Sequence, residues 1–204
     1  EEMLEAFGNS LEGPDLEAAV RVMQKADQGG YRDRREAFGQ VLEEVPWDAP
    51  PEIEDLIAFW TAMFPKCSIP MKGAFEVLAS LREREIPIGL ITNGGVEFQN
   101  AKIDRVDLRE WLDLVVVSGA VGMEKPDPRI FHLALSEMEL EAKDTAFVGD
   151  HPVNDVSGAA EVGMTSVWIK GREPWPEALA PPDHTIVELG ELIPALDGLP
   201  IVRG

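Results

Sequence analysis

The sequence predicts an α/β protein, in which a doubly wound parallel sheet follows an all-α domain. The first observation is a change of pattern after residue 67: apolar residues recur at helical spacing before it, and short apolar runs alternate with helical segments after it. The second is that these runs lack polar–apolar alternation, as expected of parallel strands covered on both faces. We therefore expect a helical domain over residues 1–67 and an α/β core over residues 68–204.

Three helices are expected in the first domain. Pro14 is placed to open the first helix, and Asp33 can cap the second. Pro65 ends the third, because proline cannot continue a helix. A glycine pair separates the first two helices, and Tyr31 beside that pair is a candidate gate to a substrate pocket.

Strands and helices alternate in the core. The expected strands cover residues 86–91, 114–117, 145–148 and 166–169, with a weak fifth at 185–187. The expected helices cover residues 73–84, 96–106, 128–137, 153–162 and 189–196. Right-handed crossovers in this order build one sheet with helices on both faces. Ligands bind at the carboxyl ends of the strands of such a sheet, so the polar residues there are the candidates for chemistry.

The composition excludes several kinds of partner. A formal net charge of −20 repels nucleic-acid phosphates and anionic lipid headgroups over a Debye length of about 8–10 Å. No apolar run reaches the roughly 20 residues that cross a bilayer. The acidic start does not resemble a secretory signal, so we expect a cytoplasmic location. Cys67 is the single cysteine, which excludes an internal disulfide. A site for an anionic substrate must therefore be built locally from a lysine, backbone amides or a cation.

The first strand leads into Thr92-Asn93-Gly94-Gly95. A hydroxyl followed by amides in a tight glycine turn can hold phosphoryl oxygens. The alternative is a plain turn, because Asn-Gly is a common turn pair.

After the second strand, Lys125 precedes two prolines and is held on a stiff loop. Its ammonium can neutralise a phosphate or a carboxylate. The alternative is a surface lysine near a helix start, where a cation is disfavoured by the helix dipole.

The third strand ends at Gly149-Asp150, and Asp155 follows five residues later. Two carboxylates at this position suit Mg²⁺, which usually takes one or two carboxylates and keeps several waters. The alternative is helix capping by either acid. His151 is interpreted as a loop residue rather than a ligand.

Thr92-Asn93-Gly94, then Lys125-Pro126-Asp127-Pro128-Arg129-Ile130-Phe131, then Gly149-Asp150 with Asp155, resemble motifs II, III and IV of the haloacid-dehalogenase-like (HAD) superfamily. The helical first half resembles the C1 cap of subfamily I. The resemblance implies a hydrolase in which Thr92, Asn93, Gly94 and Lys125 bind phosphate. It further implies that Thr92, Asn93, Lys125 and Asp155 serve catalysis, and that Asp150 and Asp155 hold Mg²⁺.

Motif I of that superfamily, a strand ending in Asp-x-Asp, is absent from residues 1–68. In the family this strand lies at the centre of the sheet, and its first Asp forms an aspartyl-phosphate. A sheet without it would leave two interior edges unpaired. We therefore expect the segment that carries it to lie upstream of Glu1. The alternative is a protein that lacks the nucleophile.

Three functions compete. The first is an Mg²⁺-dependent phosphatase of small phosphomonoesters. The second is a 2-haloacid dehalogenase, which needs no metal; such enzymes usually lose the acid after the glycine of motif IV, whereas this chain keeps Gly149-Asp150. The third is an inactive anion-binding or regulatory homologue, which becomes the first choice if the native protein begins at Glu1.

Overall fold

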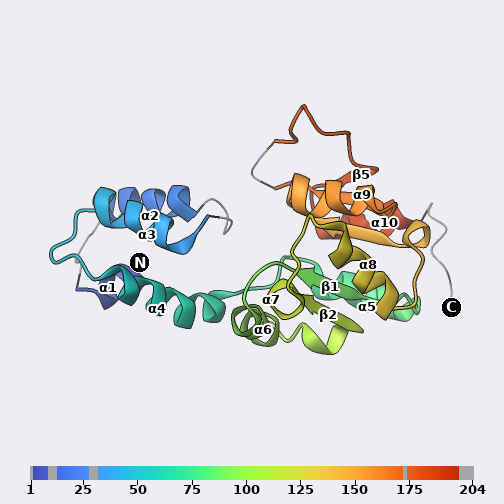
Figure 1. The fold of residues 1–204 in the computed structure, drawn as a ribbon, viewed down its shortest axis with the longest axis horizontal. Helices are drawn as coiled ribbons and strands as arrows, with labels where there is room; N and C mark the ends of the chain where they lie inside the picture. Colours follow the sequence, from blue (N-terminus) through green and yellow to red (C-terminus); the bar gives the residue numbers. More distant parts are fainter. Residues whose placement is uncertain (1, 9–12, 28–31, 172–173, 198–204) are drawn as a thin grey trace. The chain divides into compact units, whose positions relative to one another are not determined.

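The computed structural model describes residues 2–8, 13–27, 32–171 and 174–197 (Figure 1). The candidate gate Tyr31 lies outside the described residues. The chain divides into two compact units, Glu1–Cys67 and Ser68–Gly204. The boundary coincides with the change of sequence pattern after Cys67.

Unit 1 is helical in its described part. Its helices are α1 (Glu2–Ala6), α2 (Gly13–Asp27), α3 (Arg34–Glu44) and α4 (Ile53–Met63), followed by the 3₁₀ turn η2 (Phe64–Cys67). Asp33 caps α3 as expected, because its carboxylate accepts from the N–H groups of Arg35 and Glu36. The helices bury a core that includes Leu4, Ala19, Phe38, Val41 and Leu56. The sequence predicted three helices in this unit, which correspond to α2, α3 and α4. The short α1 was not predicted.

Unit 2 contains the expected alternation of strands and helices. Its strands are β1 (Gly89–Thr92), β2 (Leu114–Val117), β3 (Ala146–Gly149), β4 (Thr165–Ile169) and β5 (His184–Ile186). Its helices are α5 (Ala74–Glu83), α6 (Val96–Arg105), α7 (Ser118–Val121), α8 (Pro128–Glu137), α9 (Gly158–Glu161) and α10 (Leu192–Leu196). Short 3₁₀ turns are η3 (Arg109–Trp111), η4 (Ala142–Asp144) and η6 (Leu189–Glu191), and η5 (Pro152–Ser157) is a π-helix.

Two of the elements that differ from the prediction do so for a local structural reason. The first strand begins at Gly89 rather than at residue 86, and Pro87 just before it cannot donate a ladder hydrogen bond. The helix expected over residues 153–162 is divided into the π-helix η5 and the short α9. The N–H of Val156 donates to the carbonyl of His151, five residues earlier, which produces the wider turn.

The strands form two parallel sheets in the described chain, with the orders β1-β2 and β3-β4-β5. Thr92 lies opposite Val117 in the first sheet, and Gly149 lies opposite Trp168 in the second. The single sheet expected from the sequence is thus divided between β1 and β3. In Figure 1, β1 and β2 (green) lie apart from β5 and its neighbours (orange to red).

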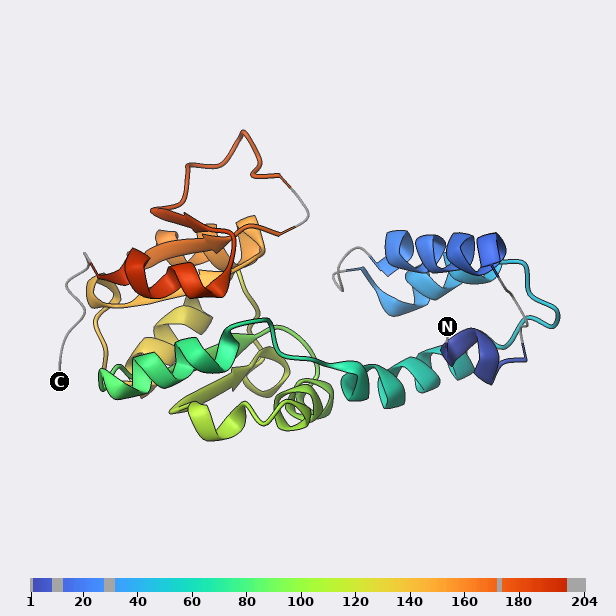
Figure 2. The ribbon, with the colours of Figure 1, turned by 180° about the vertical axis from the view of Figure 1, so that it is seen from behind.

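Helices cover both faces of these sheets. Helix α8 packs on β1 and β2, while α9 packs on β4. On the other face α5 and α10 contact each other, and they lie at the front in Figure 2. The first face buries a cluster that includes Ile91, Val116, Ile130, Phe131 and Ala159. The second buries one that includes Val77, Leu81, Val167, Ile186 and Leu192.

A groove of about 480 Å³, here called the central groove, lies between the two sheets. Its sides are residues 89–91 of β1 and residues 146–149 of β3. Apolar residues of α5 and α10 form one wall, among them Val77, Leu81, Leu192 and Leu196. Since β1 and β3 each pair on one side only within the described chain, both present a free strand edge to this apolar groove.

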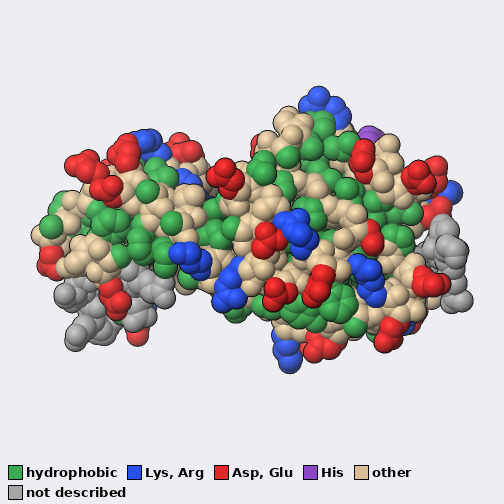
Figure 3. Space-filling model, turned by 90° about the horizontal axis from the view of Figure 1, so that it is seen from below, with side chains coloured by type: hydrophobic (Ala, Val, Ile, Leu, Met, Phe, Trp, Pro, Cys, Tyr) green, Lys and Arg blue, Asp and Glu red, His purple; other side chains and the backbone are tan. Residues whose placement is uncertain are grey.

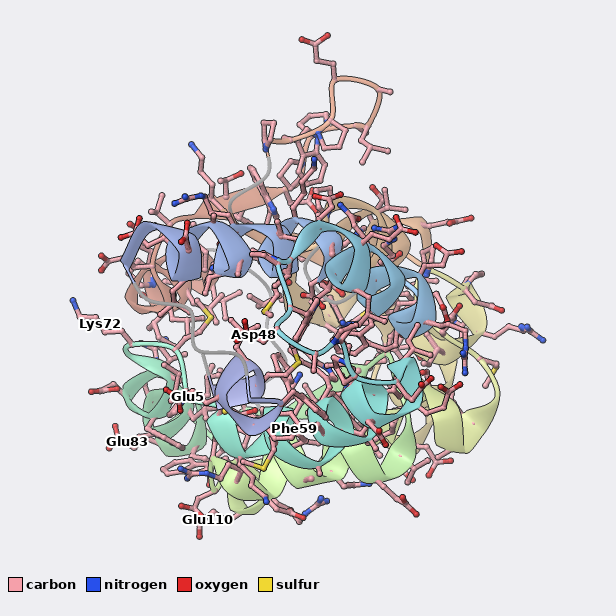
Figure 4. All side chains as sticks on the ribbon, turned by 90° about the vertical axis from the view of Figure 1, so that its left-hand side faces the viewer. Glu5, Asp48, Phe59, Lys72, Glu83 and Glu110 are labelled. Atoms are coloured by element: carbon pink, nitrogen blue, oxygen red, sulfur yellow. The ribbon has the colours of Figure 1, made fainter. Side chains whose placement is uncertain are left out.

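Charged side chains are spread over the face of unit 2 that Figure 3 shows. In Figure 3, Asp and Glu side chains are scattered between Lys and Arg side chains. Lys72, Glu83 and Glu110 extend away from the backbone in Figure 4, and none of them lines the central groove. Over the described residues, no helix is both long and apolar enough to span a bilayer.

Candidate active site

Three of the residues predicted from the strand ends lie at the central groove. Lys125, Asp150 and Asp155 all line it, at the carboxyl ends of β1 and β3. Thr92 is the last residue of β1. Asn93 follows it and is hydrogen-bonded to Lys125. The topology therefore assembles segments separated by more than fifty residues at one edge, as parallel strands do.

Lys125 and Asp155 form a buried ion pair. The Nζ atom of Lys125 lies 2.6 Å from Oδ1 of Asp155, and the two side chains are 11% and 6% exposed. The ammonium also donates to the carbonyl of Ile91 at 3.0 Å and lies 5.4 Å from the ring centre of Phe147. A buried charge pair is tolerated when further hydrogen bonds satisfy both partners, which is the case here.

Asn93 holds the backbone of Lys125. Its Nδ2 donates to the Lys125 carbonyl and its Oδ1 accepts from the Lys125 N–H, both at 2.8 Å. This pair of bonds ties the loop before α8 to the end of β1. Asn93 is expected from the sequence to bind phosphate. In the structure its side-chain amide is bonded to Lys125, which favours a role in placing that lysine.

The turn after β1 is fixed by Ser118 and Gln99, which are not among the site residues expected from the sequence. The Gly94 N–H donates to Oγ of Ser118 at 2.9 Å, and the Gly119 N–H donates to the Gly94 carbonyl at 3.1 Å. Gln99 donates to the Asn93 carbonyl at 2.7 Å. The Gly94 N–H, which was expected to bind phosphate, thus donates to Ser118 in this structure. Ser118 could have been found as the first polar residue after the apolar run 114–117.

Thr92 keeps its hydroxyl available. The side chain is half-buried and makes no hydrogen bond with any residue that the structure describes. Thr92 directly follows Ile91, whose carbonyl accepts from the Lys125 ammonium. A hydroxyl at this strand end can donate to an oxygen of a bound phosphoryl group.

Asp155 owes its position to the π-helix and to Gly149. A Cβ atom added at Gly149 would lie 2.3 Å from Cβ of Asp155, so only glycine allows this approach. The turn is capped by His151, whose Nδ1 accepts from the N–H groups of Val153 and Asn154 at 3.2 and 2.9 Å. The cap is therefore neither Asp150 nor Asp155. The structural role of His151 is compatible with its interpretation as a loop residue rather than a ligand.

The donor set fits Mg²⁺ with one direct carboxylate from this chain. Asp150 is exposed, and its carboxylate has no hydrogen bond or ion pair within the described residues. Asp155 differs, because Oδ1 is paired with Lys125 and Oδ2 accepts from the His151 N–H at 3.0 Å. The geometry thus favours orientation of Lys125 by Asp155 over direct metal binding. Over the described residues there is no cluster of three or more His, Cys, Asp or Glu side chains suited to a metal, so Asp150 would hold Mg²⁺ with ligands from elsewhere.

Comparison with known proteins gives a consistent family. The sequence model of the haloacid dehalogenase-like hydrolases matches residues 3–163. The chain is 35% identical over 191 residues to the phosphoserine phosphatase of Thermus thermophilus, covering 93% of this chain and 72% of that protein. It is 39% identical over 98 residues to the glyceraldehyde 3-phosphate phosphatase of Pyrococcus abyssi, covering 48% of this chain but 41% of that protein.

A solved structure shares the fold. The magnesium-bound HAD-hydrolase YfnB from Bacillus subtilis superimposes with a TM-score of 0.79 at 20% identity, covering 96% of this chain and 88% of that chain.

Proposed function

Because the chain belongs to the haloacid dehalogenase-like hydrolases, we propose that it is the larger part of an Mg²⁺-dependent phosphatase of small phosphomonoesters. The reaction would proceed through an aspartyl-phosphate. Its aspartate would lie on a β-strand that occupies the central groove, supplied by the segment preceding Glu1. The cytoplasmic location expected from the sequence stays a prediction.

The central groove is the observation that carries this proposal. Two free strand edges face it, its walls are apolar, and Lys125 and Asp150 stand at its carboxyl end. A parallel strand in this groove would pair with β1 on one side and with β3 on the other. The usual spacing between paired strands is about 4.8 Å. A carboxylate at the end of that strand would emerge beside the ammonium of Lys125.

The residues of this chain then act on the phosphoryl group by charge and position. The strand carboxylate attacks phosphorus, the P–O bond to the alcohol breaks, and a second acid of that strand protonates the leaving oxygen. Lys125 offsets negative charge on the carboxylate and the phosphoryl oxygens, while Thr92 donates to one of those oxygens. Water then cleaves the acyl-phosphate and releases inorganic phosphate.

Asp150 is the residue of this chain that would hold Mg²⁺. When bound, the cation would shield the negative charges of the attacking carboxylate and of the phosphoryl group. Asp155 keeps Lys125 in place through the 2.6 Å ion pair.

Small phosphomonoesters are the proposed substrate class. The names of two relatives, a phosphoserine phosphatase and a glyceraldehyde 3-phosphate phosphatase, support this class without selecting one member. The chain has a net charge of −20, which repels anions at long range. Recognition of the phosphate group by one lysine and a cation within the site is compatible with that charge.

The test is phosphate release by the full-length protein from p-nitrophenyl phosphate, O-phosphoserine and glyceraldehyde 3-phosphate. We expect turnover with MgCl₂, none with EDTA, and none from residues 1–204 alone. Activity on 2-chloropropionate that persists in EDTA would overturn the proposal in favour of a dehalogenase. Absence of turnover on every ester, with phosphate binding retained, would indicate an inactive anion-binding homologue.

A further inference from the structure

One peptide group next to the candidate metal ligand is held at both of its polar ends. The carbonyl of Asp150 accepts from the indole Nε1–H of Trp168 at 3.0 Å. The N–H of His151, which belongs to the same peptide group, donates to Oδ2 of Asp155 at 3.0 Å. Because a peptide group is planar, bonds to its oxygen and to its hydrogen fix the orientation of the whole plane.

This orientation sets the direction of the Cα–Cβ bond of Asp150, from which its carboxylate extends. That side chain is exposed and makes no hydrogen bond or ion pair among the residues described. Its direction therefore depends on the main chain that carries it. On its N-terminal side, Gly149 is paired with Trp168 in the register of β3 and β4. On its C-terminal side, the clamped peptide group fixes the backbone.

Trp168 is itself buried and packed against another ring. It lies in β4 and is 5% exposed. Its ring meets that of Trp175 edge to face, with centroids 5.1 Å apart and planes at 64°. The indole N–H is a donor only, so it cannot exchange roles with the carbonyl that it serves.

We propose that Trp168 is a positioning residue for the carboxylate of Asp150, and through it for the bound divalent cation. The inference rests on the proposed function, in which Asp150 holds Mg²⁺. Asp155 has the matching task on the N–H side of the same peptide group, so it connects the placement of the metal ligand to that of Lys125. Trp168 is assigned no contact with substrate.

The experiment is a calorimetric titration of the full-length protein and its variants with MgCl₂, without substrate. The variant Trp168→Phe keeps an aromatic ring and removes the donor. The matched control is Trp111→Phe, since Trp111 is half-buried in the same unit and packs against Phe75, and neither residue lines the central groove. The reference variant is Asp150→Asn.

We expect Trp168→Phe to weaken Mg²⁺ binding about ten-fold, in the range usual for residues that orient metal ligands. Trp111→Phe should bind as the wild type does, and Asp150→Asn should bind far more weakly. If Asp150→Asn is impaired and Trp168→Phe is not, the inference about Trp168 fails while the proposed function stands. If Asp150→Asn binds Mg²⁺ normally, the proposed metal site itself fails.

A benzothienylalanine introduced at position 168 decides the matter if Trp168→Phe does not fold. Its bicyclic ring has nearly the shape of indole but lacks the N–H. Weakened Mg²⁺ binding in this variant supports the inference, and wild-type affinity overturns it.

Discussion

The ammonium of Lys125 lies 2.6 Å from the carboxylate of Asp155, in a pair that is almost closed to solvent. The two residues are thirty positions apart, and the end of β1 joins them because the same ammonium donates to Ile91. The pair holds the ammonium of Lys125 at the end of the central groove where β1 and β3 have their carboxyl ends. An incoming carboxylate and a phosphoryl group would meet there.

Replacing Lys125 by alanine should lower turnover by about 10²-fold or more, by analogy with the loss of an oxyanion donor. It should also destabilise the fold by roughly 3–5 kcal/mol, because Asp155 loses its buried partner. Steady-state kinetics and urea unfolding measure the two effects. The double variant Lys125→Met with Asp155→Asn serves as control: stability should be partly regained while activity stays low. Normal turnover in Lys125→Ala would refute the role given to this lysine.

Asn93→Ala should lower kcat by about ten-fold, because a displacement of Lys125 that costs about 1.4 kcal/mol corresponds to that factor. The matched control is Asn100→Ala, an amide in α6 that donates to the Val96 carbonyl. Its kcat should be unchanged. Equal kcat values for the two variants would show that the bonds between Asn93 and Lys125 do not serve the reaction.

Gly149→Ala should destabilise the protein by about 1–3 kcal/mol, the usual cost of forcing atoms into a filled site. The new Cβ would approach Cβ of Asp155 to 2.3 Å. Gly39→Ala is the control, because Gly39 lies inside α3 with nothing within 4 Å of the added atom. That change should stabilise by about 0.5–1 kcal/mol. Chemical denaturation of both variants gives the comparison, and similar stabilities would contradict the proposed crowding at Gly149.

Asp183 should make stability depend on pH in the acid range. Hydrogen bonds from the backbone N–H and hydroxyl of Ser166 hold the pKa of this carboxyl below its usual value. A carboxyl with a depressed folded-state pKa stabilises the fold above its unfolded pKa of about 3.9, and the contribution is lost as pH falls through the folded-state pKa.

The melting temperature of Asp183→Asn should therefore lie below that of the wild type between pH 5 and 8. The difference should shrink below about pH 4. A difference that grows in acid would have the wrong sign for this account.

The strand ends could be predicted because each combines a short apolar run with a polar residue that follows it. Parallel strands end at one edge, so Asn93, Lys125 and Asp155 could be expected to meet without knowledge of their contacts. The helical unit 1 followed in the same way from apolar spacing and from caps such as Asp33.

The exact hydrogen bonds could not be predicted, since they depend on distances between segments. Sequence reasoning assigned the Gly94 amide to phosphate, whereas Ser118 accepts it. The π-helical turn at residues 152–157 has the same apolar spacing as an α-helix over so short a span, so periodicity does not separate the two. The gap in the sheet between β1 and β3 could be expected only from the family resemblance. The residues of β1 and β3 themselves do not indicate that a strand between them is missing.

The most direct measurement is a crystal structure of the full-length protein with Mg²⁺ and beryllium fluoride, which imitates a phosphoryl group on a carboxylate. We predict a strand between β1 and β3, parallel to both, whose terminal aspartate carries the fluoride within hydrogen-bond distance of Lys125 Nζ, with Mg²⁺ on Asp150. A central groove filled by other side chains, or a Lys125 directed away from the fluoride, would contradict the account.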